Sequence, residues 1–488
     1  MKLKKLLCAS QIPVPYWSEE LINQDISAIT HNSNEVKPGS LFVALCGFTT
    51  DGHTYLREAS NKGAAVAFVE RKCPVSIPQI VVPDTRKALA YIANAFYGSP
   101  AKKMSLIGVT GTNGKTTTTQ LVHHILGQTR KSGLIGTIDV RYGSKIEPSS
   151  LTTPDVILLH EILQRMLSAN VSCVSMEVSS HALELHRVTG LLFDHVAITN
   201  ISTDHLDLHH SLANYTQTKL SLLNQLNPLG NGFYNIDDAI LRRHLYGAKN
   251  TLSYGKHPKA DLRIMCFSHS LFQITFSLHA QRLLKKNLQP STIQLQMFGE
   301  HNIYNAVLAT GLCLAHGCDV QTIVQGLESF QGVHRRLQVI HNQSFKVIDD
   351  YAHNPAGIAA SIQAVSTINP KRLIVVCAIR GTRGCTINQE NGTSLLESLG
   401  SVNFPVHLII TAATDSVNAK DRVSSDERLA FVSVFNDSPF PVYEEPLLCE
   451  ALNRALRLAG EGDIMLLLGA QGMDRAQEII RHSLMVGV

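Results

Sequence analysis

A chain of 488 residues exceeds what one hydrophobic core usually supports, so several domains are expected. Hydrophobic residues make up 44% of the chain and charged residues 17%, which excludes global disorder. The formal net charge of +4 is spread without a dense basic run, so neither nucleic acid nor an anionic membrane surface is expected as the main partner.

Residues 1–100 are expected to form a small α/β domain, because short apolar runs alternate with amphipathic stretches up to Gly98-Ser99-Pro100. The basic start is followed by an apolar patch too short for a signal peptide, and the longest apolar runs elsewhere are only strand-length. A cytoplasmic protein without membrane insertion is therefore expected. The ten Cys residues contain no C-x-x-C pair, which favours reduced core thiols over zinc or disulfides.

Residues 101–332 are expected to form a mostly parallel sheet covered by helices, with strands at 105–109, 171–176 and 195–199. An antiparallel excursion follows, with strands at 262–265, 272–278 and 293–296, and then an apolar helix near 303–314. Residues 333–488 repeat the α/β alternation, with strands at 346–348, 372–378, 406–411 and 464–468. The polar stretch 388–394 is expected to be a loop.

A glycine-rich turn follows the first strand of the second domain. It reads Gly111-Thr112-Asn113-Gly114-Lys115-Thr116, and a helix is expected to begin at Thr117. Backbone N–H groups of such a turn wrap a phosphate, and the helix N-terminus adds positive potential. Lys115 would reach the β and γ phosphates of ATP, and the Thr116 hydroxyl would bind Mg²⁺.

Two further polar clusters lie at the carboxyl ends of the expected strands 171–176 and 195–199. Glu177, at the carboxyl edge of an apolar strand, suits a hard cation beside the phosphates, although a lone Glu is usually a solvated loop residue. The segment Asn200–His210 is rich in His and Asp, but its spacing matches no usual zinc pattern, so a Mg²⁺ or phosphate role is favoured for His205. His209 and His210 are expected at the surface.

These motifs in this order, together with Thr152-Thr153-Pro154, resemble the Mur ligase family, closest to its MurE type but with a diverged C-terminal domain. The resemblance implies a uridine-binding domain (1–100), a P-loop-type ATP-binding domain (101–332) and a Rossmann-like amino-acid-binding domain (333–488). It implies an ATP- and Mg²⁺-dependent ligase that adds an amino acid to UDP-N-acetylmuramoyl-L-alanyl-D-glutamate through an acyl phosphate, in peptidoglycan precursor synthesis. A monomer is expected.

The same resemblance implies the site residues. The catalytic group would be Lys115, Arg187, His205 and Lys219, of which Lys219 would carry a carbamate. ATP would contact Gly111, Thr112, Asn113, Gly114, Lys115, Thr116, Thr117, His301, Asn302, Asn305, Arg336 and Asp350. The muramoyl substrate would contact Ser33, His53, Thr152, Thr153, Ser179 and Arg187. Metal ligands would be Thr116, Glu177, His205 and carbamylated Lys219.

The acceptor side departs from the family pattern. Members that take meso-diaminopimelate carry Asp-Asn-Pro-Arg where this chain has Asp415-Ser416-Val417-Asn418, and the motifs at 380–383 and 469–474 are also eroded. Asn cannot replace an arginine fork on a second carboxylate, so diaminopimelate is not the expected acceptor, while lysine, another amino acid or an unusual amine stay open.

Two alternative functions stay open as well. One is a related ligase that joins a different acid and amine, as folylpolyglutamate synthetases do with the same architecture. The other is an ATP-binding relative without catalysis. The similarity of the first domain to a uridine-binding domain argues against folate, and the retained Lys115, Glu177, His205 and Lys219 argue against loss of catalysis.

Overall fold

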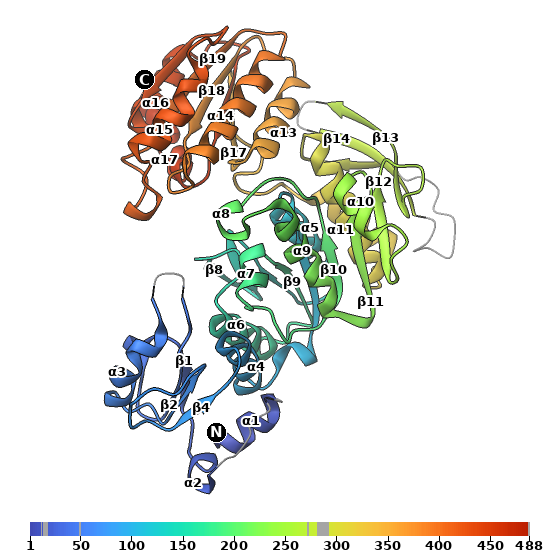
Figure 1. The fold of residues 1–488 in the computed structure, drawn as a ribbon. Helices are drawn as coiled ribbons and strands as arrows, with labels where there is room; N and C mark the ends of the chain where they lie inside the picture. Colours follow the sequence, from blue (N-terminus) through green and yellow to red (C-terminus); the bar gives the residue numbers. More distant parts are fainter. Residues whose placement is uncertain (11, 13–17, 48–49, 271–272, 281–291, 487–488) are drawn as a thin grey trace.

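The computed structural model describes residues 1–488 except 11, 13–17, 48–49, 271–272, 281–291 and 487–488. Three α/β bodies follow one another along an elongated molecule, from the N-terminal body at one end to the C-terminal body at the other (Figure 1). Each body has its own sheet, of four, eleven and six strands respectively. The expected α/β class is therefore confirmed.

The N-terminal body is built on a parallel sheet whose strand order is the chain order. Its strands are β1 (Ala28–Thr30), β2 (Ser40–Val43), β3 (Val66–Val69) and β4 (Gln79–Val81), and its helices are α1 (Leu3–Ser10), α2 (Glu19–Ile22), α3 (Leu56–Asn61) and α4 (Thr85–Phe96). Strands β2 and β3 are wholly buried because helices cover both faces of the sheet.

The middle body places β5 (Ser105–Thr110) at the centre of its sheet, between β9 (Cys173–Glu177) and β10 (Phe193–Ile198), both parallel to it. One flank holds β6 (Ser132–Ile135), β7 (Asp139–Tyr142) and β8 (Lys145–Pro148). The other holds β11 (Leu226–Asn235), β12 (Thr251–Gly255), β13 (Leu262–Ser270), β14 (Gln273–Ala280) and β15 (Thr292–Leu295). Strands β13, β14 and β15 pair antiparallel, which confirms the excursion, although Phe272 lies outside the described residues.

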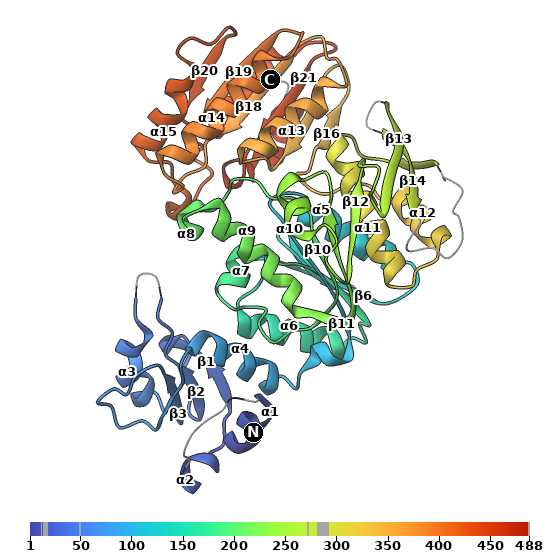
Figure 2. The same ribbon diagram turned by 45° about the vertical axis from the view of Figure 1, so that its right-hand side comes forward.

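Helices of the middle body pack on this sheet. They are α5 (Lys115–Gly127), α6 (Val156–Ser168), α7 (Ser180–Glu184), α8 (Leu206–His209), α9 (Leu212–Leu220), α10 (Ala239–Leu245), α11 (Glu300–Ala315) and α12 (Val320–Ser329). Helices α5 and α11 lie side by side, although the 172 residues from 128 to 299 separate them along the chain (Figure 2). The fold thus brings the start of α11 next to the turn that precedes α5.

The C-terminal body has a sheet in the order β16-β17-β21-β18-β19-β20, parallel except for the edge strand β16. Its strands are β16 (Gln338–Asn342), β17 (Lys346–Asp350), β18 (Leu373–Ala378), β19 (Val406–Thr411), β20 (Val442–Glu445) and β21 (Ile464–Leu468). Its helices are α13 (Pro355–Ser366), α14 (Cys385–Gly400), α15 (Ser425–Val432), α16 (Leu448–Leu458) and α17 (Ala476–Val486). The expected four strands of this domain are all present.

The loop expected at 388–394 is wrong, because these residues lie inside α14. Asn388 and Asn391 are buried, and their side chains bind backbone carbonyls: Asn388 Nδ2 donates to Arg380 O at 3.0 Å, and Asn391 Nδ2 donates to His353 O at 3.2 Å. These polar side chains therefore form tertiary hydrogen bonds instead of facing solvent, and the local sequence does not show those distant partners.

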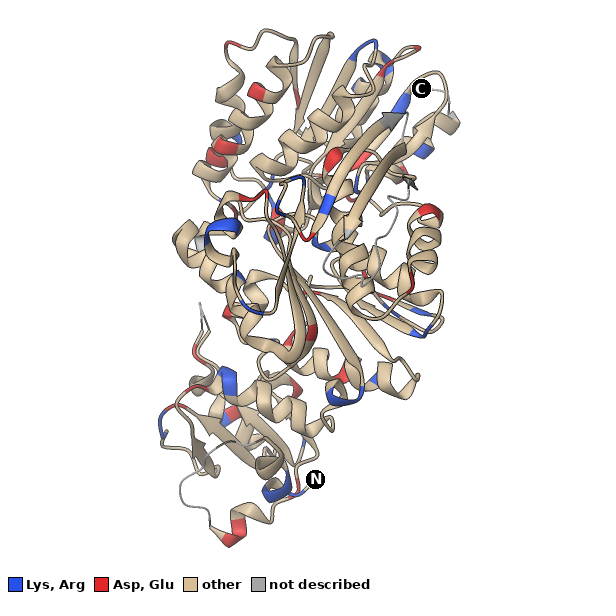
Figure 3. Ribbon diagram, turned by 90° about the vertical axis from the view of Figure 1, so that its right-hand side faces the viewer, with Lys and Arg blue, Asp and Glu red and all other residues tan. Residues whose placement is uncertain are grey.

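Within the described part of the chain, no helix has the length and apolarity to cross a membrane. Acidic and basic residues occur together in each of the three bodies (Figure 3).

Candidate active site

The glycine-rich turn after β5, called the cradle from here on, requires its two glycines. Gly111 and Gly114 have φ of +137° and +89°. A Cβ on Gly111 would lie 1.8 Å from Thr199 Oγ1, and one on Gly114 would lie 2.4 Å from Asn305 Oδ1. Both positions therefore exclude a side chain. The helix begins at Lys115, two residues before the expected start at Thr117, so its free backbone N–H groups face the turn.

The end of β10 holds the cradle in place. Asn113 N donates to Asn200 Oδ1 at 2.9 Å, and Asn200 Nδ2 donates back to Asn113 O at 3.0 Å. The Thr199 hydroxyl also donates to Asn113 O at 2.6 Å. The segment that starts at Asn200 therefore fixes the turn in addition to presenting His205.

Two lysines converge on one carbonyl oxygen of the cradle. Lys115 Nζ donates to Gly111 O at 2.9 Å, and Lys219 Nζ, from α9, donates to the same oxygen at 2.8 Å. Lys219 is 1% exposed, and its Nζ lies 4.5 Å from the centroid of the Tyr215 ring. Burial, reinforced by the charge of Lys115, lowers the pKa of Lys219 well below its usual value. Burial therefore favours the uncharged form of the Lys219 amine.

Glu177, at the end of β9, gathers oxygen atoms beside the cradle. This carboxylate is 1% exposed and accepts hydrogen bonds from Thr116 Oγ1 at 2.9 Å, Thr137 N at 2.7 Å and Thr137 Oγ1 at 3.0 Å. A buried carboxylate needs a compensating charge, and a hydroxyl and a carboxylate at hydrogen-bond distance are the oxygen donors that Mg²⁺ prefers. The donor set of Thr116 and Glu177 therefore fits a magnesium ion.

His205 stands at the start of α8 in a left-handed conformation, with φ of 54°. Its ring lies 4.8 Å from that of His181, and its Nε2 lies 3.8 Å from Asp204 Oδ2. Burial lowers the pKa of His205 to about 3, so the imidazole is neutral and able to act as a ligand. The surface position expected for His209 is wrong: its ring packs 5.2 Å from that of Tyr215, and the side chain is buried.

The C-terminal body contacts the cradle directly. Arg336 Nη2 donates to Thr116 Oγ1 at 3.2 Å, and the side chains of Asn354 and Asn113 exchange two hydrogen bonds of 3.2 Å. Asn354 Nδ2 also donates to Asp204 Oδ2 at 3.3 Å. The site therefore lies between the middle and C-terminal bodies, as expected from Arg336.

Three residues at this junction were not singled out by the sequence. Asp204 lies in the segment Asn200–His210, and Asn354 lies four residues after Asp350. Their closeness to these expected site residues was the signal that could have identified them. Thr137 belongs to no motif, and only the approach of its loop to Glu177 reveals it.

Other residues expected to bind ATP lie at the same junction, but their side chains form hydrogen bonds within the protein. Asn305 Nδ2 donates to Asn302 Oδ1 at 3.0 Å, and Asn302 Nδ2 donates to Phe298 O at 2.8 Å. Asp350 accepts from Leu337 N at 2.7 Å and from Ala352 N at 2.9 Å. His301 is half-buried near the loop that contains Leu337, and desolvation lowers its pKa.

The expected substrate residues of the middle body form a connected strip beyond Glu177. Thr153 Oγ1 donates to Glu177 O at 2.9 Å and accepts from Ser179 N at 3.0 Å, while Arg187 Nη1 donates to Thr153 O at 3.0 Å. Thr152 Oγ1 accepts from Thr137 Oγ1 at 3.1 Å. Thr153 is wholly buried and ties the strip together, whereas Thr152, Ser179 and Arg187 are partly exposed.

The other expected substrate residues, Ser33 and His53, lie in the N-terminal body. Ser33 Oγ donates to Glu58 Oε2 at 3.0 Å. His53 Nδ1 lies 2.6 Å from Asp51 Oδ1, and Nε2 accepts from Glu70 N at 3.0 Å. Both side chains are buried and already hydrogen-bonded, so they shape the surrounding loops.

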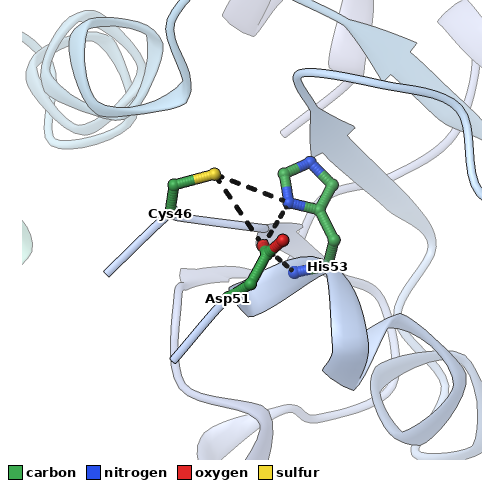
Figure 4. A group of neighbouring side chains, drawn as sticks. All are labelled: Cys46, Asp51 and His53. Carbon is green, nitrogen blue, oxygen red and sulfur yellow. Dashed lines mark hydrogen bonds and ion pairs between the residues drawn. The ribbon is translucent and has the colours of Figure 1, made fainter. Parts of the chain in front are cut away.

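Cys46, Asp51 and His53 also form a group of potential metal ligands whose donor atoms lie within 4.8 Å of one another (Figure 4). Because His53 Nε2 accepts a backbone N–H, the ring proton sits on Nδ1 and is donated to Asp51. A metal on Nδ1 would require a doubly deprotonated ring. Arg71 already neutralises Asp51, so the group holds a turn together rather than a cation.

Two carboxylates of the C-terminal body, one in the acceptor-side motif and one in α15, accept hydrogen bonds from backbone N–H groups. Asp415 accepts from Leu448 N at 2.7 Å and Cys449 N at 3.2 Å, at the start of α16. Glu427 accepts from Arg383 N at 2.7 Å and Gly384 N at 2.8 Å, which pins the loop after β18. These carboxylates stabilise backbone turns.

Family models match most of the chain. The Mur ligase family catalytic domain matches residues 25–97, the Mur ligase middle domain matches 109–313, and the Mur ligase glutamate ligase domain matches 335–471. A protein of Geobacillus thermodenitrificans named UDP-N-acetylmuramoyl-L-alanyl-D-glutamate–2,6-diaminopimelate ligase is 33% identical over 483 residues, covering 96% of this chain and 94% of that protein.

Solved structures share the fold over the whole length. A crystal structure of MurF from Acinetobacter baumannii superposes with a TM-score of 0.70 at 23% identity, covering 99% of this chain and 98% of that one. MurF of Thermotoga maritima, crystallised with ADP, gives a TM-score of 0.65 at 19% identity, covering 97% of this chain and all (100%) of that one.

Proposed function

The chain belongs to the Mur ligase family of ATP-dependent, amide-forming ligases, and we propose that it performs the MurE-type step in peptidoglycan precursor synthesis. In that step an amino acid is added to UDP-N-acetylmuramoyl-L-alanyl-D-glutamate. The observation that carries this proposal is the convergence of Lys115, Lys219 and Glu177 on the cradle, with Arg336 of the C-terminal body across from them. A nucleotide-binding module without catalysis has no need for this second set of side chains.

The first half-reaction joins two anions. The substrate carboxylate attacks the γ phosphorus of ATP, the bond to the β-γ bridging oxygen breaks, and an acyl phosphate and ADP form. Lys115 would leave its two carbonyl partners, Gly111 O and Thr112 O, and bind the β and γ phosphates. Arg336, already 3.2 Å from the Thr116 hydroxyl, would add positive charge from the opposite body.

Magnesium would be held by Thr116 and Glu177, with His205 as the further ligand that the family resemblance implies, and would offset the charge that develops on the phosphate oxygens. We propose that the buried amine of Lys219, whose pKa burial lowers, reacts in its uncharged form with carbon dioxide and loses a proton to give a carbamate, which would extend toward the same cradle. A charged lysine could not do this, because it lacks the lone pair that attacks carbon dioxide. Burial of Lys219 is therefore what supports this modification.

In the second half-reaction the acceptor amine attacks the acyl carbon and phosphate leaves. The strip of Thr152, Ser179 and Arg187 would hold the muramoyl dipeptide next to the cradle. Closure by the C-terminal body, through Asn354 on Asn113 and Asp204, would exclude water from the acyl phosphate.

For the acceptor, we propose an amino acid other than meso-diaminopimelate, although the Geobacillus relative is named for that acceptor. Asn418 stands where an arginine fork would bind a second carboxylate, and Asn offers no bidentate charge-assisted contact. Asp415, the first residue of the same motif, caps α16. Recognition of the distal end of the acceptor therefore needs a different chemistry in this chain.

Phosphate release tests both parts of the proposal. Purified protein is mixed with ATP, Mg²⁺ and UDP-N-acetylmuramoyl-L-alanyl-D-glutamate, and amino acids, including L-lysine and meso-diaminopimelate, are added one at a time. We expect release that requires both the muramoyl dipeptide and one amino acid, and weaker release with diaminopimelate. If diaminopimelate were the best acceptor, the acceptor proposal would be wrong. Tight ATP binding without release for any amino acid would contradict the ligase assignment for this substrate.

A further inference from the structure

Two buried thiols meet at the C-terminal end of α11, away from the cradle. Cys318 N donates to Cys313 O at 2.9 Å, and Gly317 between them has φ of +85°. This pattern is a Schellman motif, in which the residue after the left-handed glycine folds back onto the last full turn of the helix. The motif brings the side chains at its two ends into contact, and here both are cysteines.

The two sulfur atoms are chemically unequal. Cys313 is completely buried, and burial raises the pKa of its thiol well above the usual value. The hydrogen bond that Cys313 donates lowers the pKa of Cys318 to about 7, and Arg130 Nη2 lies 4.0 Å from Cys318 Sγ. Cys318 can therefore ionise to a thiolate near neutral pH, while its neighbour Cys313 stays a protonated thiol.

The two thiols also differ in their exposure to solvent. Cys318 is 8% exposed whereas Cys313 is 0% exposed, so a small oxidant reaches Cys318 first. A thiol of lowered pKa that is slightly exposed and lies beside a second, fully buried thiol is the arrangement of a redox-sensitive pair. The ordinary interpretation, an apolar contact that closes a helix end, explains the burial but not the guanidinium at Cys318.

We propose that Cys313 and Cys318 are a modification site, which a hydroperoxide oxidises to a reversible disulfide across the end of α11. With hydrogen peroxide, the Cys318 thiolate attacks one oxygen, the O–O bond breaks, and the hydroxide that leaves takes a proton from solvent to become water, with a sulfenic acid left on Cys318. The Cys313 sulfur then displaces that hydroxyl as a second water. Both thiols are oxidised and the peroxide is reduced, so the balance needs no other reagent.

Mass spectrometry of the full-length chain tests the site. Reduced protein is treated with hydrogen peroxide, the free thiols are blocked with N-ethylmaleimide, and tryptic peptides are analysed. Both cysteines fall in one peptide, because no Lys or Arg lies between them. We expect this peptide to lack both maleimides and to be lighter than the reduced peptide by two hydrogen atoms, a change that dithiothreitol reverses.

Matched variants identify the order of events. Cys313→Ser should leave a sulfenic acid on Cys318 that dimedone traps, whereas Cys318→Ser should leave Cys313 unmodified. Alkylation of Cys318 by iodoacetamide should rise through a pH near its pKa of about 7. The buried Cys377, whose pKa burial raises to about 12, should stay unreactive in the same experiment.

Two results would overturn the proposal: a pair that stays reduced while exposed Cys46 is oxidised, or a disulfide from Cys318 to Cys173 instead. The wild-type measurement does not depend on the variants, so it decides the question even where a variant fails to fold. Because the readout is a peptide mass, it is also independent of the proposed ligase activity.

Discussion

In the cradle, the side chains of Lys115, Lys219 and Glu177 gather around one loop, and Lys219 and Glu177 are buried. In the C-terminal body, Asp415 and Glu427 instead accept hydrogen bonds from backbone N–H groups of their own domain. Asp415, which belongs to the acceptor-side motif, therefore has a structural role. The comparison indicates that the side chains proposed to bind ATP face the cradle, whereas these carboxylates of the C-terminal body hold backbone segments together.

The largest effect is expected from the cradle lysine. Lys115→Ala removes the cation that would bind the transferred phosphoryl group, and we expect turnover to fall by roughly 10²- to 10³-fold. Phosphate release at saturating substrates measures this. The exposed Lys103→Ala is the matched control and should keep full activity. If Lys115→Ala were as active as Lys103→Ala, the proposed role of Lys115 in phosphoryl transfer would be wrong.

Lys219→Ala should reduce turnover by roughly 10- to 100-fold, because the carbamate that would bind a metal ion is lost. Short carboxylates such as acetate should restore part of the activity by occupying the vacated space, while Lys103→Ala should not respond to them. If Lys219→Ala kept wild-type turnover, the carbamate role would be wrong.

Gly111→Ala tests whether the cradle geometry itself is required. The added Cβ would overlap Thr199 Oγ1, so the turn must shift, and we expect a destabilisation of about 1–3 kcal/mol together with weaker ATP binding. Urea unfolding and nucleotide titration measure the two effects. Gly127→Ala, in the last turn of the same helix with only Ser132 Oγ at 3.8 Å, should be close to neutral in both. Similar losses in the two variants would mean that the crowding at Gly111 is unimportant.

The smallest effect on activity is expected on the acceptor side. Asp415→Ala removes the acceptor of two N–H groups at the start of α16 and should destabilise the protein by about 0.5–2 kcal/mol. The KM for the amino acid should not change, because the side chain is used structurally. A raised KM with unchanged stability would show instead that Asp415 contacts the acceptor, and the contrast between the two regions would fail.

Much of the cradle could be predicted from local pattern. A strand, a turn with glycines at 111 and 114, and a helix are contiguous in the chain, so their geometry follows from short-range rules. The roles of Asn354 and Thr137 could not be predicted in this way. Asn354 meets Asn113 across 241 positions of sequence, and Thr137 reaches Glu177 from a loop without a motif.

The polar helix α14 and the buried His209 also show what sequence patterns cannot predict, namely which polar side chains are buried. Composition assigned Asn388, Asn391 and His209 to solvent, but each has a buried partner: a carbonyl of another loop for the two asparagines, and the Tyr215 ring for His209. A polar side chain can be buried where distant parts of the chain supply a hydrogen bond or a packing contact for it, and local sequence does not show those parts.

The sequence by itself determined the class of the protein, the three α/β segments and the phosphate cradle, because hydrophobic periodicity and glycine positions act over short stretches of chain. Tertiary structure alone decided that Lys219 is buried beside Lys115 with a lowered pKa, that Arg336 reaches Thr116, and that Asp415 is used as a helix cap. Charge state and access depend on which distant segments pack around a side chain, and that packing exists only in the folded chain.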